Sequence, residues 1–179
     1  YSDYLHPYDE NYIIGFGKDT EEVSQKDWQG NAADSIALYQ GMKIALFDVT
    51  DVNKPIEKYK EIIGGRGTDS ELLRNHKALL FAKDKNLLAF PVTVMEVKDR
   101  SPGAFQYGEF TFQGAYVYNL DLEHGFQLRG RITHLTGEDY QKAGYNWDGS
   151  KNNVERIIYI ENKLYTLSRG MIKAHDILS

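Results

Sequence analysis

The chain has 179 residues, of which 41% are hydrophobic and 26% charged, an ordinary globular composition. Its 21 Lys and Arg against 26 Asp and Glu give a net charge of −5, so no broad basic surface is available for phosphates and nucleic acid is not an expected partner. The lack of cysteine excludes disulfides, cysteine-ligated metals and a thiol nucleophile. No run of about 18 apolar residues occurs, so no membrane span is expected.

An internal repeat organises the chain. Three segments place an Asn just before an apolar run, and Asn11, Asn86 and Asn162 are 75 and 76 residues apart. A second motif follows each of them, begins with Gly and reaches an Asp: GMKIALFDVTD from Gly41, GAYVYNLDLE from Gly114 and GMIKAHDILS from Gly170. Two motifs that recur in the same order indicate a repeat architecture.

Each repeat predicts a series of short strands. The first has apolar or alternating stretches at 4–8, after Asn11, from Gly41 and at 55–64. The second has them at 78–82, after Asn86, from Gly114 and at 125–133, and the third at 157–160, after Asn162 and from Gly170. The third repeat stops before a fourth strand. Asn and Asp suit the tight turns between the first two strands of each repeat because they tolerate positive φ.

Four consecutive strands without a crossover helix are typical of a β-propeller blade. We therefore predict an all-β partial propeller with one blade at 1–64, a second at 76–134 and an incomplete third at 154–179. A barrel or β-sandwich built from the same strands is the alternative. Closed propellers have about 4–8 blades, so the chain is expected to be the C-terminal part of a longer protein, with the remaining blades as its partners.

The segment ALFDVTDVNKPIEKYKEIIGG at 45–65 carries a family resemblance. Asp48, Thr50, Asp51 and Pro55 match an apolar strand, an Asp-Val-Ser/Thr-Asp turn and a following Pro. With the segments at 6–20, 76–94 and 112–134, the chain resembles the secreted bacterial and archaeal β-propellers that are distantly related to WD40 repeats. The resemblance implies an extracellular or cell-surface location, but it brings no catalytic residues. Trp147-Asp148 looks like a WD dipeptide but lies between repeats.

The longer connections are expected to converge on one face, here called the long-loop face. They run over 18–40, 64–75, 98–109 and 135–153, and they contain both tryptophans and several tyrosines that suit a binding surface. Packing of these aromatic residues within their own loops is the alternative. The candidate binding residues are Trp28, Arg66, Asp69, Glu71, His76, Tyr107, Tyr140 and Trp147, and Tyr145 belongs to the same aromatic set.

Two polar segments allow more than one interpretation. Asp69, Ser70 and Glu71 could bind a cation or polar group at the channel mouth, or form a capped helical turn. The oxygen-rich segment from Asp48 to Asn53 could hold calcium, although a turn stabilised by Asp and Thr side chains before the Pro explains it better. The spacing of the five histidines is not typical of a zinc site. These histidines are His6, His76, His124, His134 and His175.

Function is less determined than fold. The chain lacks GxSxG, P-loop, GxGxxG and HExxH motifs. We expect a non-catalytic module that binds extracellular protein or polysaccharide through the long-loop face. One alternative is a polymer hydrolase or lyase with acid or base groups among Asp69, Glu71, Glu138 and Asp139. Another is a purely structural module whose exposed blade faces favour self-association.

Overall fold

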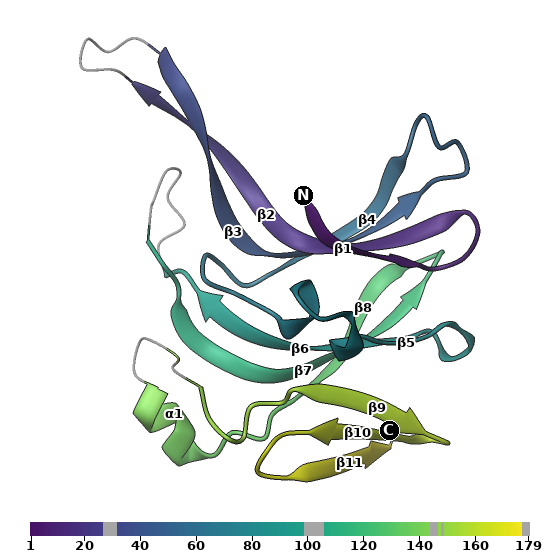
Figure 1. The fold of residues 1–179 in the computed structure, drawn as a ribbon, viewed down its shortest axis with the longest axis vertical. Coiled ribbons are helices and arrows are strands. Elements are labelled where there is room, and N and C mark those ends of the chain that lie inside the picture. The colour runs from purple at the N-terminus through teal and green to yellow at the C-terminus, as the bar shows by residue number, and fades with distance from the viewer. Residues whose placement is uncertain (27–31, 99–105, 144–146, 148, 177–179) are drawn as a thin grey trace.

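The structure is a computed structural model that describes residues 1–26, 32–98, 106–143, 147 and 149–176. Three separate antiparallel sheets are stacked one above another in the view of Figure 1. The first blade contains β1 (Ser2–Pro7), β2 (Tyr12–Lys26), β3 (Ala32–Asp48) and β4 (Ile56–Ile63) in that spatial order. The second contains β5 (Leu80–Ala82), β6 (Leu87–Glu96), β7 (Glu109–Asp121) and β8 (Gly125–Ile132). The third contains β9 (Arg156–Ile160), β10 (Lys163–Leu167) and β11 (Ile172–Asp176).

The predicted all-β partial propeller is confirmed, because consecutive strands pair as neighbours within each sheet. Helical segments in the described residues are short. They are α1 (Gly137–Ala143) and the 3₁₀ turns η1 (Glu71–Leu73), η2 (His76–Ala78) and η3 (Lys83–Lys85). None of the described helices has the length and apolar character needed to cross a bilayer.

The Asn-containing turns differ in backbone detail. Asn86 adopts the left-handed conformation at φ 50°, and its carbonyl accepts a hydrogen bond from the Leu120 N–H at 2.8 Å. The Asn11 carbonyl accepts the equivalent bond from the Val49 N–H at 2.8 Å. In the third blade the left-handed residue is Glu161, at φ 55°, rather than the Asn that follows it. The shared Asn therefore marks the turn without always taking its strained position.

The connection expected over 18–40 is largely a hairpin rather than a loop. β2 and β3 continue their pairing to Lys26 and Ala32, and the ribbon they form projects beyond the stacked blades (Figure 1). Glu21 and Glu22 on this ribbon are exposed. Thr20, Glu21 and Glu22 follow one another on β2 there, so the periodicity that predicts half-buried strands is weak.

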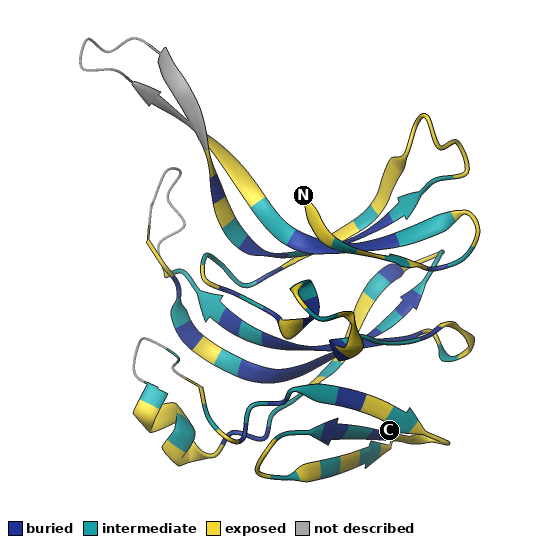
Figure 2. Ribbon diagram, viewed as in Figure 1, coloured by how far each residue is buried: buried dark blue, intermediate teal, exposed yellow. Residues whose placement is uncertain are grey.

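The core consists of apolar layers between neighbouring blades, and Figure 2 shows the buried residues along the central strands. Between the first two blades, Phe90 lies 5.8 Å from Phe16 and 6.0 Å from Tyr118, measured between ring centroids. The Tyr118 hydroxyl donates to Glu61 on β4 at 2.8 Å. Leu87, Val117, Ile157 and Leu164 belong to the layer between the second and third blades.

The outer side of the third blade remains apolar and exposed. Ile160 and Ile172 are 56% and 66% exposed. In the described residues, β11 pairs on one side only, with β10, whereas the first two blades each have four strands.

Candidate functional site

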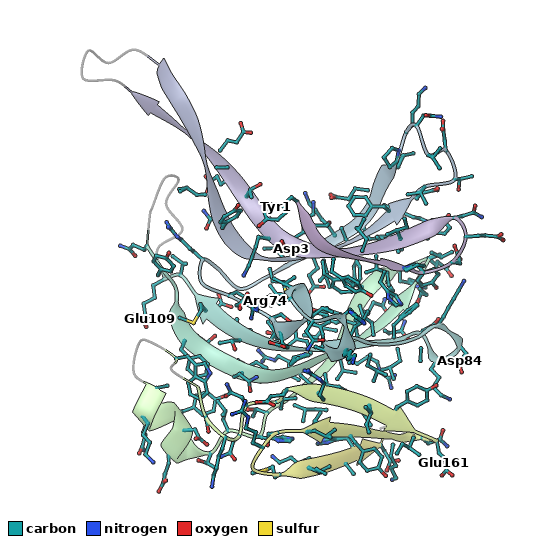
Figure 3. All side chains as sticks on the ribbon, viewed as in Figure 1. Tyr1, Asp3, Arg74, Asp84, Glu109 and Glu161 are labelled. Carbon is teal, nitrogen blue, oxygen red and sulfur yellow. The ribbon has the colours of Figure 1, made fainter. Side chains whose placement is uncertain are left out.

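Two pockets open on the long-loop face, one at each junction between blades. The first, the blade 1–2 pocket, has a volume of about 450 Å³, and the second, the blade 2–3 pocket, has a volume of about 410 Å³. Both are lined by Asp69 and Arg74, which lie in the connection between β4 and β5. Figure 3 shows Arg74 close to Tyr1 and Asp3 at the start of the first blade. The two pockets therefore share a wall.

The shared wall is held by backbone pairing and by a cap. The Asp69 N–H donates to the Thr93 carbonyl at 2.9 Å, and the Thr93 N–H donates back to the Asp69 carbonyl at 2.8 Å, so this connection pairs with β6. Ser70 caps η1, and its side-chain oxygen accepts a hydrogen bond from the Leu72 N–H at 3.2 Å. The predicted capped turn is confirmed. It fixes the direction of the Asp69 side chain.

The Asp69 carboxylate forms ion pairs with two basic side chains. Its carboxylate lies 3.1 Å from Lys18 Nζ and 2.7 Å from the Arg74 guanidinium. Lys18 also donates to the Thr68 carbonyl. Burial acts to raise the pKa of Asp69, but the hydrogen bond from Arg74 and the charge of Lys18 outweigh it and hold the pKa below its ordinary value. Asp69 is therefore a charged anchor for two basic side chains at neutral pH.

Tyrosine rings form the rim of the blade 1–2 pocket. Tyr107 is 70% exposed, and the Arg66 guanidinium lies 4.4 Å from its ring centroid. Tyr39, from β3, is 53% exposed and meets Tyr1 edge-on at 5.5 Å. The Gly108 N–H donates to the Arg66 carbonyl at 2.8 Å and joins the residues beside Tyr107 to the β4–β5 connection. Exposed aromatic faces thus stand beside charged groups.

The blade 2–3 pocket is more polar. Gln113 on β7 is 4% exposed, and its side chain makes two hydrogen bonds to the backbone of Val154: Nε2 donates to the carbonyl at 3.0 Å and Oε1 accepts from the N–H at 2.9 Å. Arg169 forms an ion pair with Glu155 at 3.0 Å. Arg156, the first residue of β9, is half-buried and donates to the Glu155 carbonyl at 2.6 Å.

The repeat explains why the pockets recur. Gln40 and Gln113 each stand directly before the Gly of the second motif, and each lines its own pocket. Lys18 and Thr93 are 75 residues apart, the same spacing as the first two Asn anchors, and they also line successive pockets. Their surroundings differ, since Gln40 donates to the exposed Glu21 at 3.2 Å. In the sheet register Lys18 pairs with Met42 whereas Thr93 pairs with Gln113, so the two pockets are built from neighbouring rather than identical repeat positions and differ in chemistry.

The predicted site residues separate into groups. Arg66, Asp69 and Tyr107 line the blade 1–2 pocket, while Glu71 lines the blade 2–3 pocket and accepts from the Asn75 side chain at 3.2 Å. His76 stacks on Tyr4 at 6.2 Å.

Trp147 and Tyr140 occupy a different place, because both rings pack on Phe110, at 4.4 Å and 5.7 Å. These contacts correspond to the loop-packing alternative for the two rings. Trp28 and Tyr145 lie outside the described residues.

The remaining polar segments are explained by local structure. The Thr50 N–H donates to Asp48 at 2.9 Å and the Asn53 N–H donates to Asp51 at 3.0 Å, which forms the predicted turn. Within the described ranges, no three His, Asp or Glu side chains are grouped to hold a metal ion. Calcium binding stays a prediction.

Glu138 and Asp139 lie in α1. Asp139 accepts hydrogen bonds from the Thr136 backbone, Asn152 and Ser150, and these bonds hold its pKa well below the usual range. Glu138 pairs with Lys142 at 3.6 Å. Asp139 thus joins the start of α1 to the connection that leads into β9.

Several pocket residues were not among the sequence candidates, namely Lys18, Tyr39, Arg74, Gln113 and Arg156. Gln113 and Arg156 lie on β7 and β9, outside the long connections from which the candidates were taken.

A family model described as "Beta propeller domain" matches residues 1–179, in agreement with the blades described above. The chain belongs to the β-propeller domain family. This propeller chain is 31% identical over 176 residues to an "Uncharacterized protein" of Archaeoglobus fulgidus, covering 98% of the chain and 19% of that protein. It is 25% identical over 170 residues to "Uncharacterized protein MJ1554" of Methanocaldococcus jannaschii, covering 94% of the chain and 18% of that protein. The propeller chain thus spans less than a fifth of the length of these relatives. No solved structure matches it significantly.

Proposed function

We propose that this propeller chain is a non-catalytic binding module whose long-loop face holds a polysaccharide. The observation that carries the proposal is the tyrosine rim of the blade 1–2 pocket beside the Lys18, Asp69 and Arg74 cluster. The faces of sugar rings stack on exposed aromatic rings, while their hydroxyls bond to charged side chains. Exposed Tyr107 and Tyr39 provide the first kind of contact, and the cluster provides the second.

The shape of the face supports a polymer rather than a single small molecule. Two pockets of similar volume follow one another across two blade junctions and share one wall. A chain of linked sugars can occupy both and gain affinity from each, as tethered binding units do. An extracellular or cell-surface location rests on the family resemblance and belongs to the same proposal.

Binding agrees better with the site than proton transfer does. A general acid needs a carboxyl group with a raised pKa, but the pKa of Asp69 is lowered despite its burial, because Arg74 and Lys18 contact it. The carboxylate of Asp139 is occupied by three hydrogen-bonding neighbours. The hydrolase or lyase alternative predicts polymer turnover that Asp69→Asn or Glu138→Gln removes.

The test is calorimetric titration of the chain with neutral and acidic oligosaccharides. Loss of an aromatic stacking partner costs about 0.5–1.5 kcal/mol beyond its area, so Tyr107→Ala and Tyr39→Ala should each weaken binding severalfold. Tyr165→Ala is the matched control, since Tyr165 lies on β10 and lines neither pocket. No measurable binding of any oligosaccharide, or an equal loss in all three variants, contradicts the proposal.

A further inference from the structure

Arg156 in the blade 2–3 pocket has a different environment from the other two arginines that line this pocket. Arg74 and Arg169 each face a carboxylate, at 2.7 Å from Asp69 and 3.0 Å from Glu155. Arg156 donates to the Glu155 carbonyl, and among the residues that the structure describes no carboxylate lies within 4.0 Å of its guanidinium. A half-buried guanidinium without a counterion interacts strongly with an anion that reaches it, because water screens it less.

We propose that Arg156 binds a carboxylate of the ligand, so that the polysaccharide recognised by the long-loop face contains uronic acid units. This inference rests on the proposed function and names its substrate class. The guanidinium presents a planar set of N–H donors that matches the two oxygens of a carboxylate. Neutral sugars offer no such group.

The surroundings of Arg156 suit a sugar that carries the acid. Thr93 and Asn153 line the same pocket and provide a hydroxyl and a carboxamide for ring hydroxyls. Glu71 and Glu155 also line it, but Glu71 accepts from Asn75 and Glu155 pairs with Arg169, so both carboxylates already have partners. The pocket therefore has donors available near Arg156, and two of the three carboxylates that line it, those of Asp69 and Glu155, are paired with arginines.

The position of Arg156 also fits a polymer that starts at the tyrosine rim. It begins β9, the first strand of the third blade, and the pocket around it shares Asp69 and Arg74 with the blade 1–2 pocket. An oligosaccharide stacked on Tyr107 can cross this shared wall and reach Arg156 with a later unit. Recognition is thus divided between stacking at one junction and charge at the next.

The decisive experiment compares uronate oligosaccharides with their methyl esters, which keep the sugar and remove the charge. By calorimetry, the unmodified chain should bind the acids about tenfold or more tightly than the esters, the effect of a charged hydrogen bond. Arg156→Gln should abolish this preference, and Arg156→Lys should keep part of it. Lys142→Gln makes the same charge change on α1, outside both pockets, and should alter nothing. Circular dichroism of each variant verifies folding.

The outcomes separate the two proposals. Equal affinity for acids and esters, or a preference that survives in folded Arg156→Gln, overturns the carboxylate site while the Tyr107-dependent binding remains. Absence of binding to every oligosaccharide overturns both proposals. Binding of polyglutamate that depends on Arg156, with no binding of uronates, assigns the face to an acidic peptide and overturns the saccharide assignment.

Discussion

Gln113 offers a direct test of how the wall of the blade 2–3 pocket is held. Its side chain bonds both the N–H and the carbonyl of Val154, which is 2% exposed. Gln113→Leu keeps a similar side-chain volume and leaves both buried backbone groups without partners. Each unsatisfied group costs about 1–3 kcal/mol, so the loss of both bonds should lower the free energy of unfolding by about 2–6 kcal/mol.

The assay is chemical denaturation combined with amide hydrogen exchange. For a chain of this size, that loss corresponds to a decrease in Tm of roughly 5–25 °C. Exchange at the Val154 amide should accelerate more than exchange in the first blade. The matched control is Gln40→Leu, which also stands directly before the Gly of its motif; its side chain contacts exposed Glu21, and the expected change is within about 0.5 kcal/mol.

Equal destabilisation by Gln113→Leu and Gln40→Leu would refute this reasoning. It would mean that the repeat position itself, rather than the two bonds to Val154, determines the cost. A large loss of stability without faster exchange at Val154 would also contradict it.

Three further results are expected. Gly125→Ala should destabilise by about 2 kcal/mol or more, because Gly125 has φ +71° and an added Cβ would lie 2.5 Å from the Tyr59 ring; a melt that matches the unmodified chain would contradict this. Burial, and then the charges of neighbouring groups, lower the pKa of His134, so His134 binds a proton more readily in the unfolded chain than in the folded one. The free energy of unfolding should therefore decrease as pH falls below about 6.5, and it should decrease less in His134→Gln. Urea titrations at pH 8 and pH 5.5 measure this difference. The isolated chain should self-associate at tens of micromolar through its exposed outer face, and Ile172→Lys should reduce this in light scattering, whereas a monodisperse unmodified chain would argue against it.

The propeller fold could be predicted from the sequence because the repeat recurs at turn residues, whose type is restricted by the backbone conformation of the turn. Asn11 and Asn86 mark the same turn in successive blades, and the apolar runs that follow them form β2 and β6. The sequence was less informative for the ribbon from Thr20 to Lys26, because a run of mainly polar residues lacks the alternation that identifies a strand. Polar residues there suggested a loop.

The candidate site was only partly predictable for a different reason. Arg66, Asp69 and Tyr107 were found because they lie in connections rich in polar and aromatic residues. Arg156 was missed because it starts an ordinary apolar strand, and the pocket that it lines is formed together with residues of the second blade such as Thr93 and Gln113. Which cation faces a carboxylate depends on contacts such as Arg169 with Glu155, and sequence spacing does not determine such contacts between elements.

The wall shared by the two pockets has a consequence for how binding preferences can change. Asp69 and Arg74 line both pockets from a single connection, so neither pocket can be altered there without altering the other. Substitutions in this connection should therefore have non-additive effects when combined with changes at Tyr107 or Arg156, whereas changes at those two residues should combine additively. A substitution in the shared connection would therefore change the ligand preference of both subsites at once, whereas a change at Tyr107 or Arg156 would act on one of them.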